Sequence, residues 1–300
     1  MKSFRAFLTL IVVAVSLAAT PLFAAGTPIN PEGFDAIVTN GPVADAATIA
    51  SSAWATKIKN AGTLRLGGTQ TSNLFSLLNE KDGKIRGFDA GLAQMITRYI
   101  LGDSLKFTFV TVTSSTREQV LINDQADMVF ATYSITPARA EKISFAGPYY
   151  SSRSGVLVKA GNTDIKSYTD LAGKKVATQA GSTGVATLKN YAPAATILEF
   201  QTDQECLDAL RQGRIDAYVT DVTLLLNTLS KGSGDFQLAG DAFGNEDPYG
   251  IGLPKGSDGV AFVNAFLKKI EADGTWTKLW LVAIGDRTGN SRAPNPPAIK

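Results

Sequence analysis

The sequence contains no histidine and only one cysteine, Cys206, in 300 residues. The missing histidine excludes a Ser-His-Asp triad and a Cys-His pair, and with so little cysteine most zinc sites are excluded as well. Cys206 has no second cysteine with which to form an intramolecular disulfide, and we expect a small buried apolar side chain on a helix. We therefore predict no catalytic residue, no metal site and no cofactor.

Long apolar segments are also missing, with one short exception near the N-terminus. Residues 8–19 form an apolar run, Lys2 and Arg5 precede it, and small residues follow near Ala24. This pattern is typical of an export signal and predicts a signal peptide over residues 1–24. The run is shorter than the roughly 20 residues that a transmembrane helix needs. Because no cysteine lies near the cleavage site, we predict no lipid anchor.

Neither sign of charge predominates in the chain. There are 29 Lys and Arg residues against 27 Asp and Glu residues, and the predicted signal peptide holds Lys2 and Arg5 but no acid. The exported chain is therefore formally neutral. Nucleic-acid binding calls for a basic face, so we predict no nucleic-acid partner and no polybasic membrane surface.

The chain without its signal peptide is longer than one typical domain, so two lobes are expected. From residue 62 onward, strand-like and helix-like runs alternate, which predicts α/β lobes with mainly parallel sheets. Residues 25–61 are predicted to be an N-terminal arm, poorly ordered up to residue 50 and helical around Trp54 and Ile58. The polar, proline-rich tail over residues 285–300 is expected to be loosely held.

Individual elements are indicated by periodicity and by helix-start signals. Phe88, Leu92, Ile96 and Tyr99 recur at helical spacing. The pattern Ser/Thr-x-x-Glu, a capping box, occurs at Ser115 and at Thr202 and predicts a helix start at each. The expected strands are residues 64–67, 106–112, 126–131, 155–159, 175–178, 196–200, 215–220 and 249–253.

The most informative stretch is residues 131–139, Ala-Thr-Tyr-Ser-Ile-Thr-Pro-Ala-Arg. It ends a strand, turns and begins a helix, with Thr136 as the N-cap and Pro137 as the first helical residue. A helix N-terminus already carries partial positive charge, so Arg139 is unfavourable there unless an anion is near. The stretch predicts a carboxylate or phosphate site built from amides, a hydroxyl and a guanidinium. Alternatively, Arg139 pairs with a nearby acid such as Glu141.

Two further turns lie where ligands are commonly bound. Residues 181–184, Gly-Ser-Thr-Gly, lead into a helix and offer free amides at its start. This turn lacks the Gly-Lys-Ser/Thr ending of a nucleotide-binding loop, and it could instead be an ordinary strand-to-helix turn. Asp221 follows a strand, at the edge where ligands of open α/β sheets bind. Its alternative role is the N-cap of a helix that begins at Val222.

Taken in order, these segments and several others resemble one family from about Thr63 to Trp280. The matching segments are Gly-Phe-Asp at 87–89, residues 117–127, Ser-Ile-Thr-Pro-Ala-Arg at 134–139, Phe-Ala-Gly-Pro-Tyr-Tyr at 145–150, residues 170–176, Gln-Ala-Gly-Ser-Thr at 179–183, residues 210–217, Asp221, and Tyr-Gly-Ile-Gly at 249–252. The family is that of the periplasmic solute-binding proteins for polar amino acids, family 3, which are the capture subunits of ATP-driven (ABC) importers.

The resemblance implies a type II periplasmic-binding-protein fold, in which two α/β lobes close around one ligand. Lobe 1 would hold residues 62–150 and a return segment, 250–284, and lobe 2 would hold residues 154–243. Two crossovers, near residues 149–153 and 243–248, would join them. The implied protein is a periplasmic monomer, not an enzyme, whose partners are an amino acid and a membrane permease.

The resemblance also implies roles for the residues of the three turns. Arg139 and Thr136 of lobe 1 match the residues that read the ligand α-carboxylate. Thr183, with Ser182 beside it, would add donors from lobe 2. Asp221 matches the residue that binds the α-ammonium group, and Ser134 is a further candidate for that group.

Side-chain selectivity is implied by a different pair of residues. Arg117 and Ser114 match positions that contact the side-chain carboxylate in glutamate and aspartate binders of the family. The first strand-to-helix turn, residues 69–73, contains Gln70 but no charge, so glutamine or asparagine remains an alternative ligand. Phe75 is expected either to line the mouth of the site or to pack in the core.

Two other functional classes remain alternatives. A cyclohexadienyl-dehydratase-like enzyme occurs on the same fold, and Asp221 would be its general acid. A receptor signalling domain would need a membrane helix or kinase region downstream, which the sequence does not show. We favour capture of glutamate or aspartate for transport.

Overall fold

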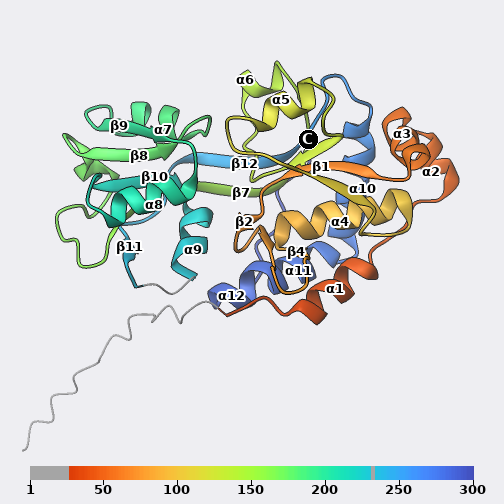
Figure 1. The fold of residues 1–300 in the computed structure, drawn as a ribbon, viewed down its shortest axis with the longest axis horizontal. Coiled ribbons are helices and arrows are strands. Elements are labelled where there is room, and N and C mark those ends of the chain that lie inside the picture. The colour runs from red at the N-terminus through yellow and green to blue at the C-terminus, as the bar shows by residue number, and fades with distance from the viewer. Residues whose placement is uncertain (1–26, 231–233) are drawn as a thin grey trace, which may run out of the picture.

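The computed structural model describes residues 27–230 and 234–300, so the predicted signal peptide lies outside the described residues. Two lobes lie side by side, and two long strands run from one into the other (Figure 1). These strands are β7 (Ser144–Lys159) and β12 (Phe243–Leu253). They pair antiparallel, with Ser154 opposite Phe243 and Tyr150 opposite Tyr249. Both crossover segments implied by the resemblance fall within this pair.

A single mixed sheet passes through both lobes, in the order β5-β1-β6-β12-β7-β10-β8-β9, and β11 pairs with β7. The pairings of β1 with β5 and β6, and of β8 with β9 and β10, are parallel, as expected for α/β lobes. The long strands add the antiparallel pairings. The bounds are β1 (Leu64–Gly68), β5 (Phe107–Thr111), β6 (Met128–Phe130), β8 (Lys175–Gln179), β9 (Thr196–Phe200), β10 (Ala217–Asp221) and β11 (Phe236–Leu238), and a small separate sheet holds β2 (Thr71–Ser72), β3 (Ser76–Leu78) and β4 (Ile85–Arg86).

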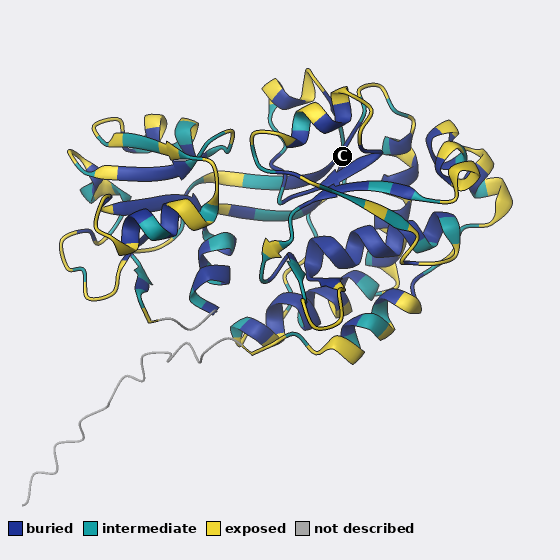
Figure 2. Ribbon diagram, in the orientation of Figure 1, coloured by how far each residue is buried: buried dark blue, intermediate teal, exposed yellow. Residues whose placement is uncertain are grey.

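Helices cover this sheet in both lobes. Lobe 1 has α3 (Ala53–Ala61), α4 (Phe88–Leu101), α5 (Arg117–Ile122), α6 (Pro137–Ala140), α10 (Gly259–Ala272) and α11 (Thr275–Trp280), and lobe 2 has η1 (Tyr168–Leu171), α7 (Gly184–Tyr191), α8 (Asp203–Arg211) and α9 (Val222–Ser230). The predicted spacing in α4 is confirmed: Phe88, Leu92 and Ile96 are fully buried. Figure 2 shows this helix buried along most of its length.

The core differs between the lobes. Lobe 1 has one large apolar cluster and a smaller one that includes Val129 and Tyr133, whereas lobe 2 has two clusters of similar size. Val156 and Val219 belong to one of the lobe 2 clusters, and their neighbours Leu157 and Tyr218 belong to the other. Since successive side chains of a strand point to opposite faces, these clusters lie on the two faces of the lobe 2 sheet.

Cys206 lies on α8, as expected, and its side chain is buried and free. Burial raises the pKa of its thiol to about 12. Ala177 of β8 belongs to the same apolar cluster of lobe 2 as Cys206.

The N-terminal arm is well packed, contrary to our expectation. It forms α1 (Pro31–Thr39) and α2 (Ala46–Ala50). The side chains of Asn30 and Asp45 cap these helices, accepting from the third residue along at 3.1 and 2.7 Å. Phe34 and Val38, one helical turn apart, are buried in the lobe 1 core. The prediction relied on the composition of the arm, which is poor in large apolar residues. It was wrong because the few apolar residues present have helical spacing, so one face of the helix can pack against the core.

The C-terminal tail is also held in place, again contrary to expectation. After η2 (Leu281–Gly285) comes the short helix α12 (Asp286–Thr288). Its Arg287 is only 6% exposed and donates to the Thr27 carbonyl at 3.2 Å. Farther on, Ala293 and Ile299 pack against the lobe 1 core. The composition of the tail is mainly polar, so it did not indicate that one arginine and two apolar residues hold the tail against lobe 1.

The two predicted capping boxes have different outcomes. The box at Thr202 is confirmed, since its hydroxyl accepts from the Glu205 amide at 3.2 Å and Glu205 accepts from the Thr202 amide at 3.1 Å. The box at Ser115 is wrong, because the N-cap residue of α5 is Thr116. The Thr116 hydroxyl accepts from the Thr113 amide at 2.9 Å, so it closes the preceding turn.

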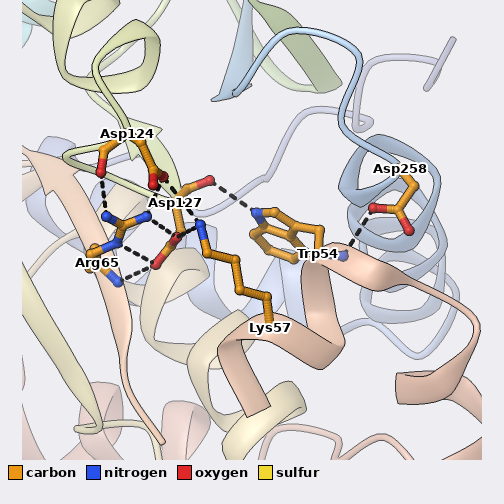
Figure 3. A network of polar contacts seen from close by, with 6 residues as sticks. All are labelled: Trp54, Lys57, Arg65, Asp124, Asp127 and Asp258. Atoms are coloured by element: carbon orange, nitrogen blue, oxygen red, sulfur yellow. Dashed lines mark hydrogen bonds and ion pairs between the residues drawn. The ribbon is translucent and has the colours of Figure 1, made fainter. Parts of the chain in front are cut away.

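A polar network at the far side of lobe 1 fixes α3 to the sheet (Figure 3). Asp127 accepts from the Arg65 backbone amide at 2.9 Å and from its guanidinium at 2.6 Å. The Trp54 indole donates to the Asp127 carbonyl at 3.1 Å, while Asp258 accepts from the Trp54 amide at 3.0 Å. Asp127, which directly precedes β6, is thus a structural residue that joins β1 and α3.

Candidate functional site

Arg139 lies where α6 meets lobe 2. Thr136 and Pro137 begin the helix as predicted, and the Arg139 amide donates to the Thr136 hydroxyl at 3.3 Å. Arg139 is 7% exposed, and its guanidinium donates to the carbonyls of Ser134 and Gly181, both at 2.8 Å. Gly181 belongs to lobe 2, so Arg139 bridges the lobes. Its acidic neighbour is Glu118, at 3.7 Å, and not Glu141, which was the example given for the alternative ion pair.

The turn at residues 181–184 presents its two hydroxyls differently. The Ser182 hydroxyl donates to the Gln179 carbonyl at 2.7 Å and accepts from the Gly184 amide at 3.1 Å, so it stabilises the turn itself. The Thr183 hydroxyl donates to Asp247 of β12 at 2.8 Å. Contact of either residue with a ligand remains a prediction.

The lobes approach each other closely at this turn. Gly181 has a left-handed φ of 72°, and a Cβ there would lie 2.8 Å from the Ser115 Cα and 2.9 Å from the Ser114 carbonyl oxygen. The Ser115 hydroxyl also donates to Gln201 of lobe 2 at 3.3 Å. The structure therefore places Ser114 at the lobe contact through its main chain, and only glycine fits opposite it.

Asp221 is the last residue of β10 and is 7% exposed. Its Oδ2 accepts a hydrogen bond from the Tyr249 hydroxyl at 2.6 Å. Burial, and then the charge of Asp247, raise the pKa of the Asp221 carboxyl to about 7. The charges of Arg117 and Arg139 oppose this shift, so three charged groups act on Asp221 at the boundary of the lobes.

Arg117, the first residue of α5, is the second buried guanidinium of the site. It is 3% exposed, and its carbon Cζ lies 4.0 Å from the centre of the Tyr133 ring. Its Nη1 donates to the Ala131 carbonyl at 2.8 Å, but within the described residues its buried Nε has no hydrogen-bond partner. Burial, followed by the charge of Arg139, lowers the pKa of Arg117 to about 10. Arg117 therefore retains donor capacity for an anion.

Three other predicted residues are placed less directly. Ser134 is buried, its carbonyl accepts from Arg139, and it forms an isolated bridge with Tyr249. The Gln70 carbonyl accepts from the Leu78 amide at 3.0 Å. The Phe75 ring is fully buried and meets that of Tyr249 edge-on at 6.2 Å. Phe75 thus supports the residue that bonds Asp221. A place for Phe75 at the mouth of the site remains a prediction.

The sequence did not reveal Asp247 and Tyr249. Both lie on the crossover strand β12, where Asp247 accepts from Thr183 and Tyr249 donates to Asp221. Asp247 lies in the implied crossover beside Pro248, and Tyr249 begins the matching Tyr-Gly-Ile-Gly segment, but neither signal indicated a role in the site.

Asp89 is the last residue of the matching Gly-Phe-Asp segment, and the sequence indicated no role for it. Its carboxylate accepts from the Thr132 amide at 2.9 Å and from the Tyr149 hydroxyl at 2.7 Å. Thr132 has a left-handed φ of 42°, which is uncommon for a β-branched residue. Asp89 therefore holds the strained turn that leads to Ser134, and such strain is typical of functional sites. Burial raises the pKa of Asp89 to about 7.

These features define a class of protein. A sheet shared by two lobes, joined by two crossovers, with buried charges from both lobes at their boundary, is the type II periplasmic-binding-protein architecture. No helix in residues 27–230 and 234–300 has the length and apolar character that a membrane crossing requires.

Residues 64–281 match the bacterial extracellular solute-binding proteins, family 3, and the chain belongs to this family. It is 36% identical to the glutamine-binding protein of a Bacillus subtilis ABC transporter, over 74% of this chain and 81% of that one. It is 31% identical to a glutamate-binding protein of Corynebacterium glutamicum, over 91% and 88% of the two chains. Among solved structures, a cysteine-binding protein from Campylobacter jejuni has a TM-score of 0.74 at 28% identity, over 80% and 96%.

Proposed function

We propose that this protein captures a polar L-amino acid between its lobes and delivers it to the permease of an ABC importer. Glutamate or aspartate is the favoured ligand. The observation that carries this choice is the buried Arg117, whose Nε lacks a partner within the described residues. A buried cation with free donors is costly unless an anion compensates it, and a side-chain carboxylate would do so.

The α-groups of the ligand are assigned to the other charges. Arg139, with the Thr136 and Thr183 hydroxyls, would bind the α-carboxylate, because a guanidinium fork matches a carboxylate. Asp221 would bind the α-ammonium group, and its neighbour Asp247 would strengthen the negative potential there. A ligand with two carboxylates and one ammonium group then complements both guanidiniums. Bridging the lobes in this way would favour the closed state.

The nature of the relatives supports transport binding over enzymatic activity. The similar proteins named above are binding proteins, for glutamine, glutamate and cysteine. Because these ligands differ, the choice of an acidic ligand rests on Arg117. Glutamine remains the principal alternative, since the turn that holds Gln70 is uncharged. We further propose export by the signal peptide to the periplasm, where the protein acts as a monomer.

Titration calorimetry with glutamate, glutamine, aspartate and asparagine tests the proposal. We expect the wild type to bind an acid at least tenfold more tightly than its amide, because the amide leaves the Arg117 charge uncompensated. Arg117→Gln should reduce or invert this preference. Arg214→Gln, on the exposed surface of lobe 2, is the matched control and should keep it. Equal affinities for acid and amide in the wild type would contradict the role of Arg117, and no binding of any amino acid would contradict capture itself.

A further inference from the structure

The lobes also touch at a second place, beside α9. The Leu74 amide of lobe 1 donates to the Asn227 side-chain oxygen of lobe 2 at 2.8 Å. The Asn73 side-chain amide donates to the Ser230 hydroxyl at 3.1 Å. Asn227 is 3% exposed, so this contact is buried between the lobes.

The C-terminal helix α12 prepares the lobe 1 side of this contact. Arg287 donates to both the carbonyl and the side-chain oxygen of Asn73, and also to the Thr27 carbonyl. Because Arg287 holds the Oδ1 atom of Asn73, the Nδ2 group of Asn73 is directed at Ser230. Helix α12 itself lies against α9. Arg287 and Thr27 both lie outside residues 64–281, the part of the chain that matches the family.

Helix α9 connects this contact to the ligand site. It begins directly after Asp221, and Asn227 follows about 9 Å farther along the helix axis. The Thr223 hydroxyl, between them, lies 2.7 Å from that of Ser152 on the crossover strand β7. A rigid helix anchored at the crossover therefore moves Asp221 and Asn227 together.

We infer that Asn73, Asn227 and Arg287 form a closure latch, which slows opening of the lobes and so sets the rate of ligand release. The Leu74–Asn227 and Asn73–Ser230 bonds join opposite lobes, so opening the lobes breaks them. Each neutral hydrogen bond of this kind favours the closed state by about 2- to 13-fold. None of the three residues needs to touch the ligand for this effect.

The expected effect of the latch on ligand release rests on the proposed function, whereas its expected effect on opening of the lobes does not. Stopped-flow measurement with glutamate should show that Asn227→Ala raises the dissociation rate about 5- to 50-fold, because the buried Leu74 amide loses its acceptor. The association rate and the glutamate-to-glutamine preference should change less than twofold. Asn190→Ala, on the exposed face of α7, is the matched control and should leave all rates unchanged.

Small-angle scattering tests the latch without any ligand. Asn227→Ala and Ser230→Ala should each give a larger radius of gyration than the wild type and Asn190→Ala. Ser230→Ala removes a single hydroxyl, so it keeps the test decisive if Asn227→Ala fails to fold. Unchanged scattering and unchanged dissociation in folded variants would overturn the latch. Unchanged scattering in a protein that binds no amino acid would overturn it as well.

A separate comparison of ligand dissociation rates tests the role of Arg287. Arg287→Gln should raise the dissociation rate in the same direction as Asn227→Ala, and the double variant should be less than additive because the two act on one contact. Arg292→Gln, exposed in the same tail, is the matched control. An Arg287→Gln variant that dissociates at the wild-type rate would remove Arg287 from the latch.

Discussion

The Tyr249 hydroxyl lies 2.6 Å from the Asp221 carboxylate, and this bond joins the crossover strand β12 to the end of β10. Tyr249 is fully buried and Asp221 almost fully, so the carboxyl is poorly hydrated. This burial is the main reason that the pKa of Asp221 rises to about 7. The group proposed to bind an ammonium ion therefore titrates near neutral pH.

Ligand affinity should depend on pH through Asp221. A bound ammonium group favours the charged carboxylate, so binding lowers the pKa of Asp221 and releases a proton near pH 7. We expect the affinity to fall as the pH drops below about 7, by at most about tenfold per pH unit. Calorimetry in buffers with different ionisation enthalpies measures the released proton directly.

Asp221→Asn provides the control for this pH dependence. It should bind weakly, since the amide cannot compensate an ammonium charge, and its residual affinity should vary less between about pH 6 and pH 8. A wild-type affinity that is constant over this interval would contradict both the raised pKa and the ammonium role.

Asp89 should make the folded state less stable as the pH rises. The pKa of Asp89 in the folded state, about 7, lies above the ordinary value of 3.8. Protonated Asp89 therefore contributes its full stabilisation to the free energy of unfolding below about pH 4, and this stabilisation is lost as the pH rises through about 7. Asp89→Asn is nearly isosteric and has no such titration. From about pH 5 to pH 8 the wild type should lose roughly 2–3 kcal/mol more of its free energy of unfolding than the Asp89→Asn variant does. Urea unfolding at the two pH values tests this, and parallel losses would contradict it.

Local chemistry accounts for what could be predicted from the sequence. The start of α6 followed from Thr136 and Pro137, because capping depends on adjacent residues. The helical spacing in α4 and the capping box at Thr202 were equally local. The order of the motifs identified the family, and with it the two lobes.

The interactions that the sequence did not reveal join distant parts of the chain. Asp89 and Thr132 are 43 residues apart, and Thr183 and Asp247 are 64 apart. Neither pair leaves a periodic pattern. The tail was misjudged for the same reason, since the partner of Arg287 is Asn73, 214 residues earlier. The alternative of an Arg139 ion pair named Glu141 because it is near in sequence, while folding brings Glu118 close to Arg139.

Arg139→Ala should weaken ligand binding by about 2–5 kcal/mol, because it removes charge-assisted bonds to the α-carboxylate. Arg139→Lys should restore only part of this loss, since lysine keeps the charge but not the planar fork. Lys142→Ala is a suitable control, because exposed Lys142 contacts the same Glu118 at 3.1 Å. Calorimetry gives the affinities and circular dichroism checks folding. Normal affinity in Arg139→Ala would make this arginine a structural ion-pair partner.

Gly181→Ala should hinder closure of the lobes. The added Cβ would meet the Ser115 Cα at 2.8 Å, and because this is backbone of the opposite lobe, the contact is relieved only by moving the lobes apart. Ligand affinity should fall at least tenfold, and the ligand-bound protein should have a larger radius of gyration. The left-handed φ adds a folding cost of about 1–2 kcal/mol, which must be separated from the effect on closure.

Gly173→Ala makes that separation. Gly173 lies in the same lobe with φ of 71°, almost equal to the 72° of Gly181, but a Cβ there would meet no atom within 4 Å. Both variants should therefore lose similar stability in urea unfolding, while only Gly181→Ala loses affinity. Equal affinities in the two variants would show that the close lobe contact at Ser115 is not needed for binding.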